Sequence, residues 1–190
     1  MRIVIKLILA VLFVSCGSDA IPKPKAYLRL EYPKPEYVVN QTILPFSFEK
    51  NSLASDISEI KISRDGNTQG VNLEYPSIKG TIYITYKAVK DDIKVYLLDA
   101  QNLTQKHTQK ADAISGERFV DEEHKVYGMF YDVGGNAASQ SQFYATDSIN
   151  HFVTGALYFN VKPNYDSILP AANYLKEDIR RIMETIRWKK

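Results

Sequence analysis

The first half of the chain has short clusters of apolar residues that predict β-strands. Residues 80–89 are rich in β-branched and aromatic side chains, which favour strands. Three of their side chains share one face of the predicted strand: Ile82, Ile84 and Tyr86. Residues 42–49 predict another strand, and residues 58–76 predict a hairpin that turns at Asp65-Gly66.

The apolar spacing then changes to intervals of three and four residues, which is typical of an amphipathic helix. The stripe comprises Ile93, Leu97, Ala100, Leu103, His107, Ala111 and Ile114. It predicts a helix of about five turns, and a carboxylate at Asp91 or Asp92 would cap its first turn.

A second stripe predicts a helix in the last part of the sequence. Its members are Ile168, Ala172, Leu175, Ile179, Ile182 and Ile186. Asp166 or Ser167 is the expected cap, and Pro170 is expected in the first turn, where proline is tolerated.

Between the two predicted helices, turn-like residues separate four candidate strands. These are residues 115–123, 125–135, 139–148 and 151–163. Strands at such short spacing favour antiparallel hairpins. The order of strands, helix, strands and helix predicts an α+β fold, an antiparallel sheet with two long amphipathic helices packed on it. This arrangement is similar, by analogy, to the PsbP/Mog1-like sandwich.

The N-terminus has the pattern of an export signal that ends at a cysteine. Arg2 precedes an apolar run from Leu7 to Val14. This run is too short to span a bilayer, which requires a helix of about 20 apolar residues. Phe13-Val14-Ser15-Cys16 resembles the lipobox of bacterial lipoproteins, with phenylalanine where leucine is commoner. We therefore expect residues 1–15 to be a lipoprotein signal peptide and Cys16 to carry the lipid. The alternative is an ordinary signal peptide.

Cys16 is the single cysteine of the sequence, so the chain cannot form an internal disulfide. Each buried CH₂ of a lipid contributes about 0.8 kcal/mol, and two or three acyl chains hold a protein stably on a membrane. We expect residues 16–40 to form the lipidated cysteine and a Pro-rich linker or arm, and residues 41–190 to form a single α+β domain. The sequence is compatible with the inner or the outer membrane.

The arm contains a short stretch with a period of two, which is typical of a strand. Its candidate partner-binding residues are Tyr27, Leu28, Arg29, Leu30 and Tyr32. Pro33 would end this strand, because proline cannot donate a hydrogen bond to a sheet. The stretch is either a strip that docks on a partner or an arm packed on its own domain.

The charge of the chain argues against nucleic acid as a partner. It has 24 basic and 22 acidic residues, and removal of Arg2 and Lys6 with the signal peptide leaves equal numbers. Nucleic-acid binding needs a strongly basic face.

No catalytic signature stands out in the sequence. It lacks G-x-S-x-G, a Walker loop, H-E-x-x-H and a Cys–His pair, and we expect no cofactor and no metal. Three histidines are the remaining candidates for chemistry: His107, His124 and His151. Their spacing matches no ligand pattern, so a site would have to assemble from distant segments.

Six stretches resemble the gliding motility lipoprotein GldD family of the Bacteroidetes. They include "IPKPKAYLRLEYP", "GTIYITYK", "VYGMFYDVGGNAAS" and "QFYATDSINHFVTGALYFN", and the series extends from residue 21 to residue 188. The resemblance implies a role in gliding and in the type IX secretion system, with GldE, a membrane protein, as a partner. It implies no catalytic residues.

Two classes of function follow. The first is a lipid-anchored, non-catalytic protein that assembles or stabilises membrane machinery and faces the periplasm. Its binding surface would use the arm or exposed tyrosines of the sheet, since tyrosine favours interfaces. The alternative is a periplasmic enzyme or small-ligand-binding module that uses His107, His124 or His151.

Overall fold

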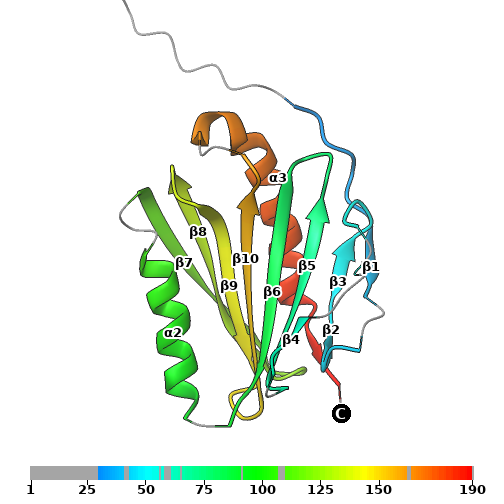
Figure 1. Ribbon diagram of the computed structural model, residues 1–190, viewed down its shortest axis with the longest axis vertical. Coiled ribbons are helices and arrows are strands. Elements are labelled where there is room, and N and C mark those ends of the chain that lie inside the picture. The colour runs from blue at the N-terminus through cyan, green and yellow to red at the C-terminus, as the bar shows by residue number, and fades with distance from the viewer. Residues whose placement is uncertain are drawn as a thin grey trace, which may run out of the picture.

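The structure, a computed structural model, describes the chain over residues 30–40, 43–55, 57, 61–64, 66–90, 92–106, 110–161 and 164–189. Its centre is an antiparallel sheet, seven-stranded within these ranges, in the order β4-β5-β6-β10-β9-β8-β7 (Figure 1). The strands are β4 (Lys61–Ile62), β5 (Thr68–Tyr75), β6 (Gly80–Ala88), β7 (Ala111–Asp121), β8 (Val126–Gly135), β9 (Ser139–Thr146) and β10 (His151–Phe159). The predicted α+β class and the antiparallel sheet are confirmed.

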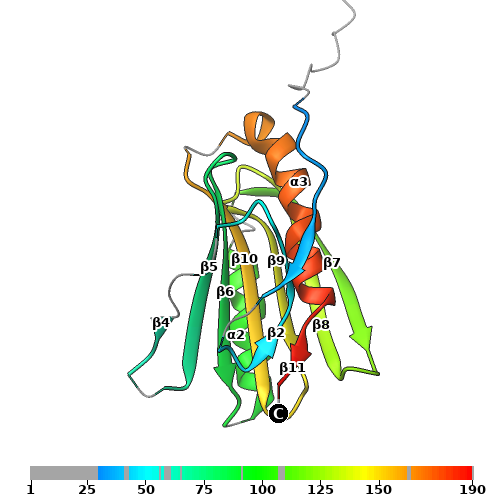
Figure 2. The ribbon, with the colours of Figure 1, turned by 90° about the vertical axis from the view of Figure 1, so that its right-hand side faces the viewer.

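The helices α2 (Ile93–Gln105) and α3 (Tyr165–Glu184) lie on opposite faces of this sheet (Figures 1 and 2). α3 shares its face with two small strand pairs. One joins β1 (Tyr37–Val39) to β3 (Glu49–Asn51), and the other joins β2 (Phe46–Ser47) to β11 (Arg187–Trp188). The last strand of the chain therefore pairs with one of the first.

The hydrophobic core lies between α3 and the sheet. Ile82, Ile84 and Tyr86 are all buried there, so the predicted face of β6 is confirmed. The apolar stripe of α3 is buried against them, and Leu175, Ile179 and Ile182 are fully inaccessible to solvent. Burial of one such side chain contributes about 1.5–3 kcal/mol, and this face therefore supplies most of the stability.

The opposite face of the sheet is less completely covered. α2 touches it through Thr104, whose hydroxyl bonds to Gln142 of β9, and through Tyr96, whose ring lies 5.7 Å from that of Phe152. Only Ala100 and Thr104 of this helix are buried, whereas Leu98 is more than half exposed. Room therefore remains between α2 and the sheet.

The first helix is shorter than its apolar spacing predicts. α2 ends at Gln105, and Ala111 and Ile114 belong to β7, where they pair with Gly135 and Val133 of β8. The prediction of one helix from 93 to 114 was wrong at its end, because pairing along the whole of β8 satisfies the backbone of β7. Asp92 caps α2 and accepts a 3.0 Å hydrogen bond from the amide of Lys94, as expected for one of the two candidates.

The second helix begins earlier than predicted. Its cap residue is Asn164, not Asp166 or Ser167, and the Ser167 hydroxyl donates instead to the Asn164 carbonyl. Pro170 consequently lies in the second turn of α3 and not in the first. Proline there removes one hydrogen bond of the helix.

The strand expected in the arm is absent from its described part. Residues 30–36 have no regular structure, and pairing begins only at β1, after Pro35. Pro33 and Pro35 lack the amide hydrogens that a strand would donate, which explains the late start.

The hairpin predicted over residues 58–76 is confirmed by the antiparallel pair β4–β5. Gly66 lies in its turn with φ of 71°, a conformation that glycine adopts without strain. Asp65 lies outside the described residues.

Candidate functional site

The described part of the arm lies against α3. The ring of Tyr32 stacks on that of Tyr174, with 4.9 Å between the centroids. Leu30, by contrast, is 46% exposed. Of the predicted partner-binding strip, Tyr27, Leu28 and Arg29 lie outside the described residues, as does the lipidation candidate Cys16.

A buried carboxylate holds the C-terminal end of the arm, at Tyr37. Asp178 of α3 is 1% exposed, and its Oδ1 accepts a 2.8 Å hydrogen bond from the Tyr37 hydroxyl of β1. The amide nitrogen of Asn51, on β3, donates to both of its oxygens at 2.9 and 3.2 Å. The same nitrogen lies 3.2 Å from the Tyr174 hydroxyl. We call these four residues, Asp178, Tyr37, Asn51 and Tyr174, the clasp.

Burial raises the pKa of Asp178, while hydrogen bonds to its charged form act in the opposite direction. The buried hydroxyl of Tyr75 faces the same carboxylate. Burial raises the pKa of Tyr75, and the nearby charge of Asp178 raises it further. The geometry of the Tyr75 hydroxyl is not that of a hydrogen bond. The carboxylate is therefore satisfied mainly by Tyr37 and Asn51.

The clasp connects two distant parts of the chain at one place. Arg181 adds to it, since its guanidinium lies over the Tyr37 ring and pairs with Glu49 of β3. A pull on the arm would therefore be transmitted to α3 and through it to the core.

The histidines are separated into different local structures. The Nδ1 of His124 lies 2.8 Å from an oxygen of Asp121 at the β7–β8 turn. The Nδ1 of His151 lies 3.0 Å from the Tyr86 hydroxyl, and its ring stacks on Trp188 at 4.9 Å. His107 lies outside the described residues. Each of the two described histidines thus has a partner that accounts for its position.

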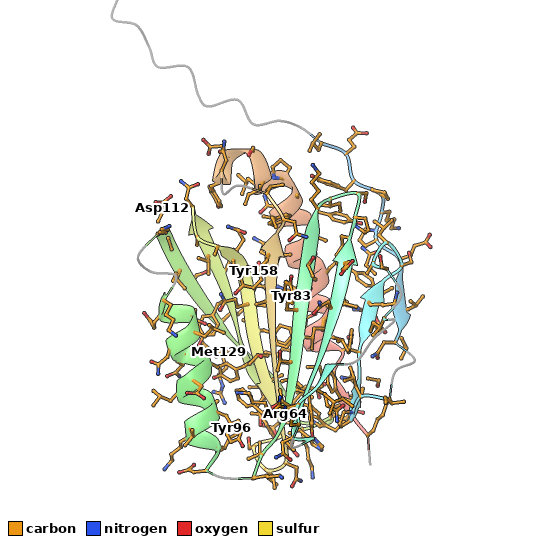
Figure 3. All side chains as sticks on the ribbon, viewed as in Figure 1. Arg64, Tyr83, Tyr96, Asp112, Met129 and Tyr158 are labelled. Carbon is orange, nitrogen blue, oxygen red and sulfur yellow. The ribbon has the colours of Figure 1, made fainter. Side chains whose placement is uncertain are left out.

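A cavity of about 170 Å³ lies between α2 and the less covered face of the sheet. Its walls include the side chains of Tyr83, Tyr131, Tyr144, Tyr158, Gln142 and Thr104. Figure 3 shows Tyr83 and Tyr158 side by side on this face, where their rings meet edge to face at 5.6 Å. Among the described residues, those that line the cavity are all uncharged.

Exposed tyrosines of the sheet were expected from the sequence, but none of these cavity residues was predicted individually. The signal for the cavity residues was the alternation, within each strand, of side chains that face the core and side chains that face away from it. Tyr83 lies between the buried Ile82 and Ile84, and Gln142 precedes the buried Phe143. Side chains of opposite parity face away from the core, so these positions could have been assigned to the second face.

Within the described ranges, no group of three or more His, Cys, Asp or Glu side chains could hold a metal ion. Neither helix in that part of the chain has the length and apolar composition to cross a bilayer.

Comparison with known proteins gives one family. Residues 17–188 match the family described as gliding motility lipoprotein GldD. No curated protein and no solved structure matches the chain. The likeness to a PsbP/Mog1-like sandwich therefore stays a prediction.

Proposed function

Because the chain belongs to the gliding motility lipoprotein GldD family, we propose that it is a lipid-anchored, non-catalytic protein required for gliding motility and type IX secretion. It would act in the assembly or stabilisation of the membrane machinery and face the periplasm. The family match over nearly the whole chain is the observation that carries this proposal.

The proposed anchor is a lipid on Cys16, immediately before the matched region. Leu30, where the description of the arm begins, lies 14 positions after Cys16. A fully extended chain spans at most about 3.6 Å per residue, so this segment reaches at most about 50 Å. The clasp then fixes the domain to the end of this tether, which keeps it within reach of proteins in the same membrane.

The proposed partner surface comprises the exposed apolar residues of the arm and Ile43, which follows it. Leu30, Val38 and Val39 are each about half exposed, and Ile43 is 81% exposed. A membrane protein similar to GldE is the partner that the family resemblance implies. Apolar side chains close to the tether are suitably placed to contact a protein held in that membrane.

The test is complementation of a deletion strain, scored by colony spreading and by secretion of an exported protein. The variants are Cys16→Ser and the double variant Leu28→Ser with Leu30→Ser. Leu98→Ser is the matched control, because Leu98 is also exposed but lies on α2. We expect the first two to lose both activities at normal abundance and the control to retain them. Full activity of Cys16→Ser would refute anchoring by that residue.

A fourth strain tests the alternative, in which the histidines form an enzymatic or ligand-binding site. It carries alanine at His107, His124 and His151. Restored spreading and secretion support the non-catalytic role. An abundant but inactive variant would instead favour the histidine site.

A further inference from the structure

The cavity between α2 and the sheet contains an unsatisfied polar group, which the clasp and the arm do not explain. Gln142 is 4% exposed, and its Nε2 has no hydrogen-bond partner in the structure. Its Oε1 lies 3.1 Å from the Thr104 hydroxyl, which also lies 3.2 Å from the Ala100 carbonyl.

If the nitrogen and oxygen of the Gln142 amide exchange places, one of its polar atoms still lacks a hydrogen-bond partner. The Thr104 hydroxyl has a single proton, which it can give either to Ala100 or to Gln142. If it bonds to Ala100, the amide nitrogen can donate to the hydroxyl oxygen, and Oε1 is then unpaired. In both orientations one polar atom of Gln142 needs a partner, and leaving such a group unsatisfied is costly.

The walls of the cavity restrict what that partner can be. None of the described residues that line the cavity is charged. The nearby Arg118 is not among them, although it acts on Tyr144 to lower its pKa against the larger effect of burial. A charged ligand would therefore lose its hydration without a charged side chain in the lining to replace it. Burial raises the pKa of Tyr131, Tyr144 and Tyr158, so these phenols stay neutral and offer hydroxyls as donors and acceptors. Tyr83, 40% exposed, stands at the solvent side.

The size of the cavity and its aromatic walls further restrict the kind of ligand that it can bind. Sites for drug-sized ligands have about 300–1,000 Å³, so a cavity of about 170 Å³ suits a single ring. The faces of tyrosine rings are electron-rich and attract the weakly positive C–H groups of a saturated ring. A hydroxyl group can both donate and accept, so it satisfies Gln142 in either orientation.

We propose that this cavity binds one uncharged ring that carries several hydroxyl groups, namely a neutral sugar. The sugar would stack against Tyr83 and Tyr158 and bond to the free end of the Gln142 amide. It could be a free monosaccharide or the terminal unit of a glycan. This site is distinct from the arm and from the histidines, and the proposal stands independently of the proposed partner.

The test uses the full chain in a zwitterionic detergent without a sugar headgroup. Saturation-transfer NMR is run with methyl glycosides of glucose, galactose, mannose and N-acetylglucosamine, each also as a tetramer, and with glucuronate as the charged probe. We expect at least one neutral glycoside to bind with a Kd in the millimolar range, near −4 kcal/mol, and glucuronate to bind more weakly. Binding of the monosaccharide alone indicates a free sugar, and equal binding of the tetramer indicates a glycan end.

Three variants locate the binding. Tyr83→Ala and Gln142→Met should each weaken it by about tenfold, or about 1.4 kcal/mol. Tyr127→Ala is the control, since Tyr127 is on the same face but outside the cavity and bonds to Glu122. Gln142→Met should also raise the melting temperature, because it removes the unpaired amide while Thr104 keeps its bond to Ala100.

The opposite results would overturn the proposal. These are no binding of any neutral glycoside, tighter binding of glucuronate, or an equal loss in Tyr127→Ala. Unchanged binding in a folded Gln142→Met variant would do the same. A higher melting temperature without any glycoside binding would show that the amide merely holds a water molecule.

Discussion

The hydroxyl of Tyr37 and the carboxylate of Asp178 form a 2.8 Å hydrogen bond between residues 141 positions apart in the sequence. This contact is the centre of the clasp. It joins the start of the described domain to its last helix, where Asp178 is buried and Tyr37 is partly buried. The stability of the fold and the position of the arm therefore depend on the same carboxylate.

Replacing Asp178 by alanine should destabilise the protein strongly. Tyr37 and Asn51 would lose their buried acceptor, and each unsatisfied group costs about 1–3 kcal/mol. We expect a loss of about 2–4 kcal/mol in the free energy of unfolding, measured with urea through the fluorescence of Trp188, the single tryptophan. Glu177→Ala, at an exposed neighbouring position, should change it by less than about 0.5 kcal/mol. Equal effects of the two variants would contradict a structural role for the clasp.

Stability should also depend on Asp147, at the turn before β10. Burial by itself would raise the pKa of this carboxyl, but hydrogen bonds from the amides of Ile149, His151 and Asn150 lower it below its usual value. A carboxyl whose pKa is lower in the folded state adds stability above its unfolded pKa of about 3.9. That stability is lost as the pH falls through the folded value.

Asp147→Asn tests this dependence, because asparagine keeps an acceptor oxygen but cannot ionise. At pH 7 the variant should be less stable than the wild type, and the difference should shrink as the pH falls below about 4. Urea midpoints from pH 7 to pH 3 measure it, with Asp99→Asn on the exposed side of α2 as the control. A difference that stays constant over this range would contradict the assignment.

The middle of the sheet should not tolerate a side chain at Gly155. A Cβ atom there would lie 2.1 Å from a ring carbon of Phe143, in the packed core face. Gly155→Ala should therefore cost about 1–3 kcal/mol in the free energy of unfolding. Gly70→Ala is the matched control, since its nearest neighbour would be 3.8 Å away. Adding Phe143→Leu should recover part of the loss, and no recovery would show that the clash lies elsewhere.

The arm should be released by loss of Tyr32 but not by loss of Leu30. Tyr32 stacks on Tyr174, whereas the side chain of Leu30 is half exposed. Tyr32→Ala should raise the rate of cleavage by a glutamyl endopeptidase at Glu31 or Glu36 several-fold, at an unchanged urea midpoint. Leu30→Ser should leave that rate unchanged. Equal cleavage of both variants would mean that the stacking does not hold the arm.

Local patterns were sufficient to predict much of the fold. The alternation in 80–89 and the stripe from Ile168 to Ile182 follow directly from burial on one side, and both were confirmed. Ile186, the last member of the predicted stripe, is buried but lies beyond the end of α3 at Glu184. The end of α2 was not predictable in this way, because Ala111 and Ile114 continue a helical spacing by coincidence. Their structure is decided by pairing with β8, a neighbour that becomes adjacent only in the folded chain.

The sites were harder to predict than the elements. Asp178 is one polar position on an otherwise apolar helix face, and its partners Tyr37 and Asn51 are distant in sequence. Gln142 is similar, because its unsatisfied amide is evident only when α2 is in place above β9. Sequence spacing shows which face a residue belongs to, but not which distant groups will meet it there.

The pairing of β2 with β11 has a consequence for how the chain is made. Synthesis at about 5–20 residues per second separates these strands by on the order of ten seconds. Phe46, fully buried in the finished core, has no strand partner until Trp188 has emerged. This edge of the core therefore closes only when nearly the whole chain has been made.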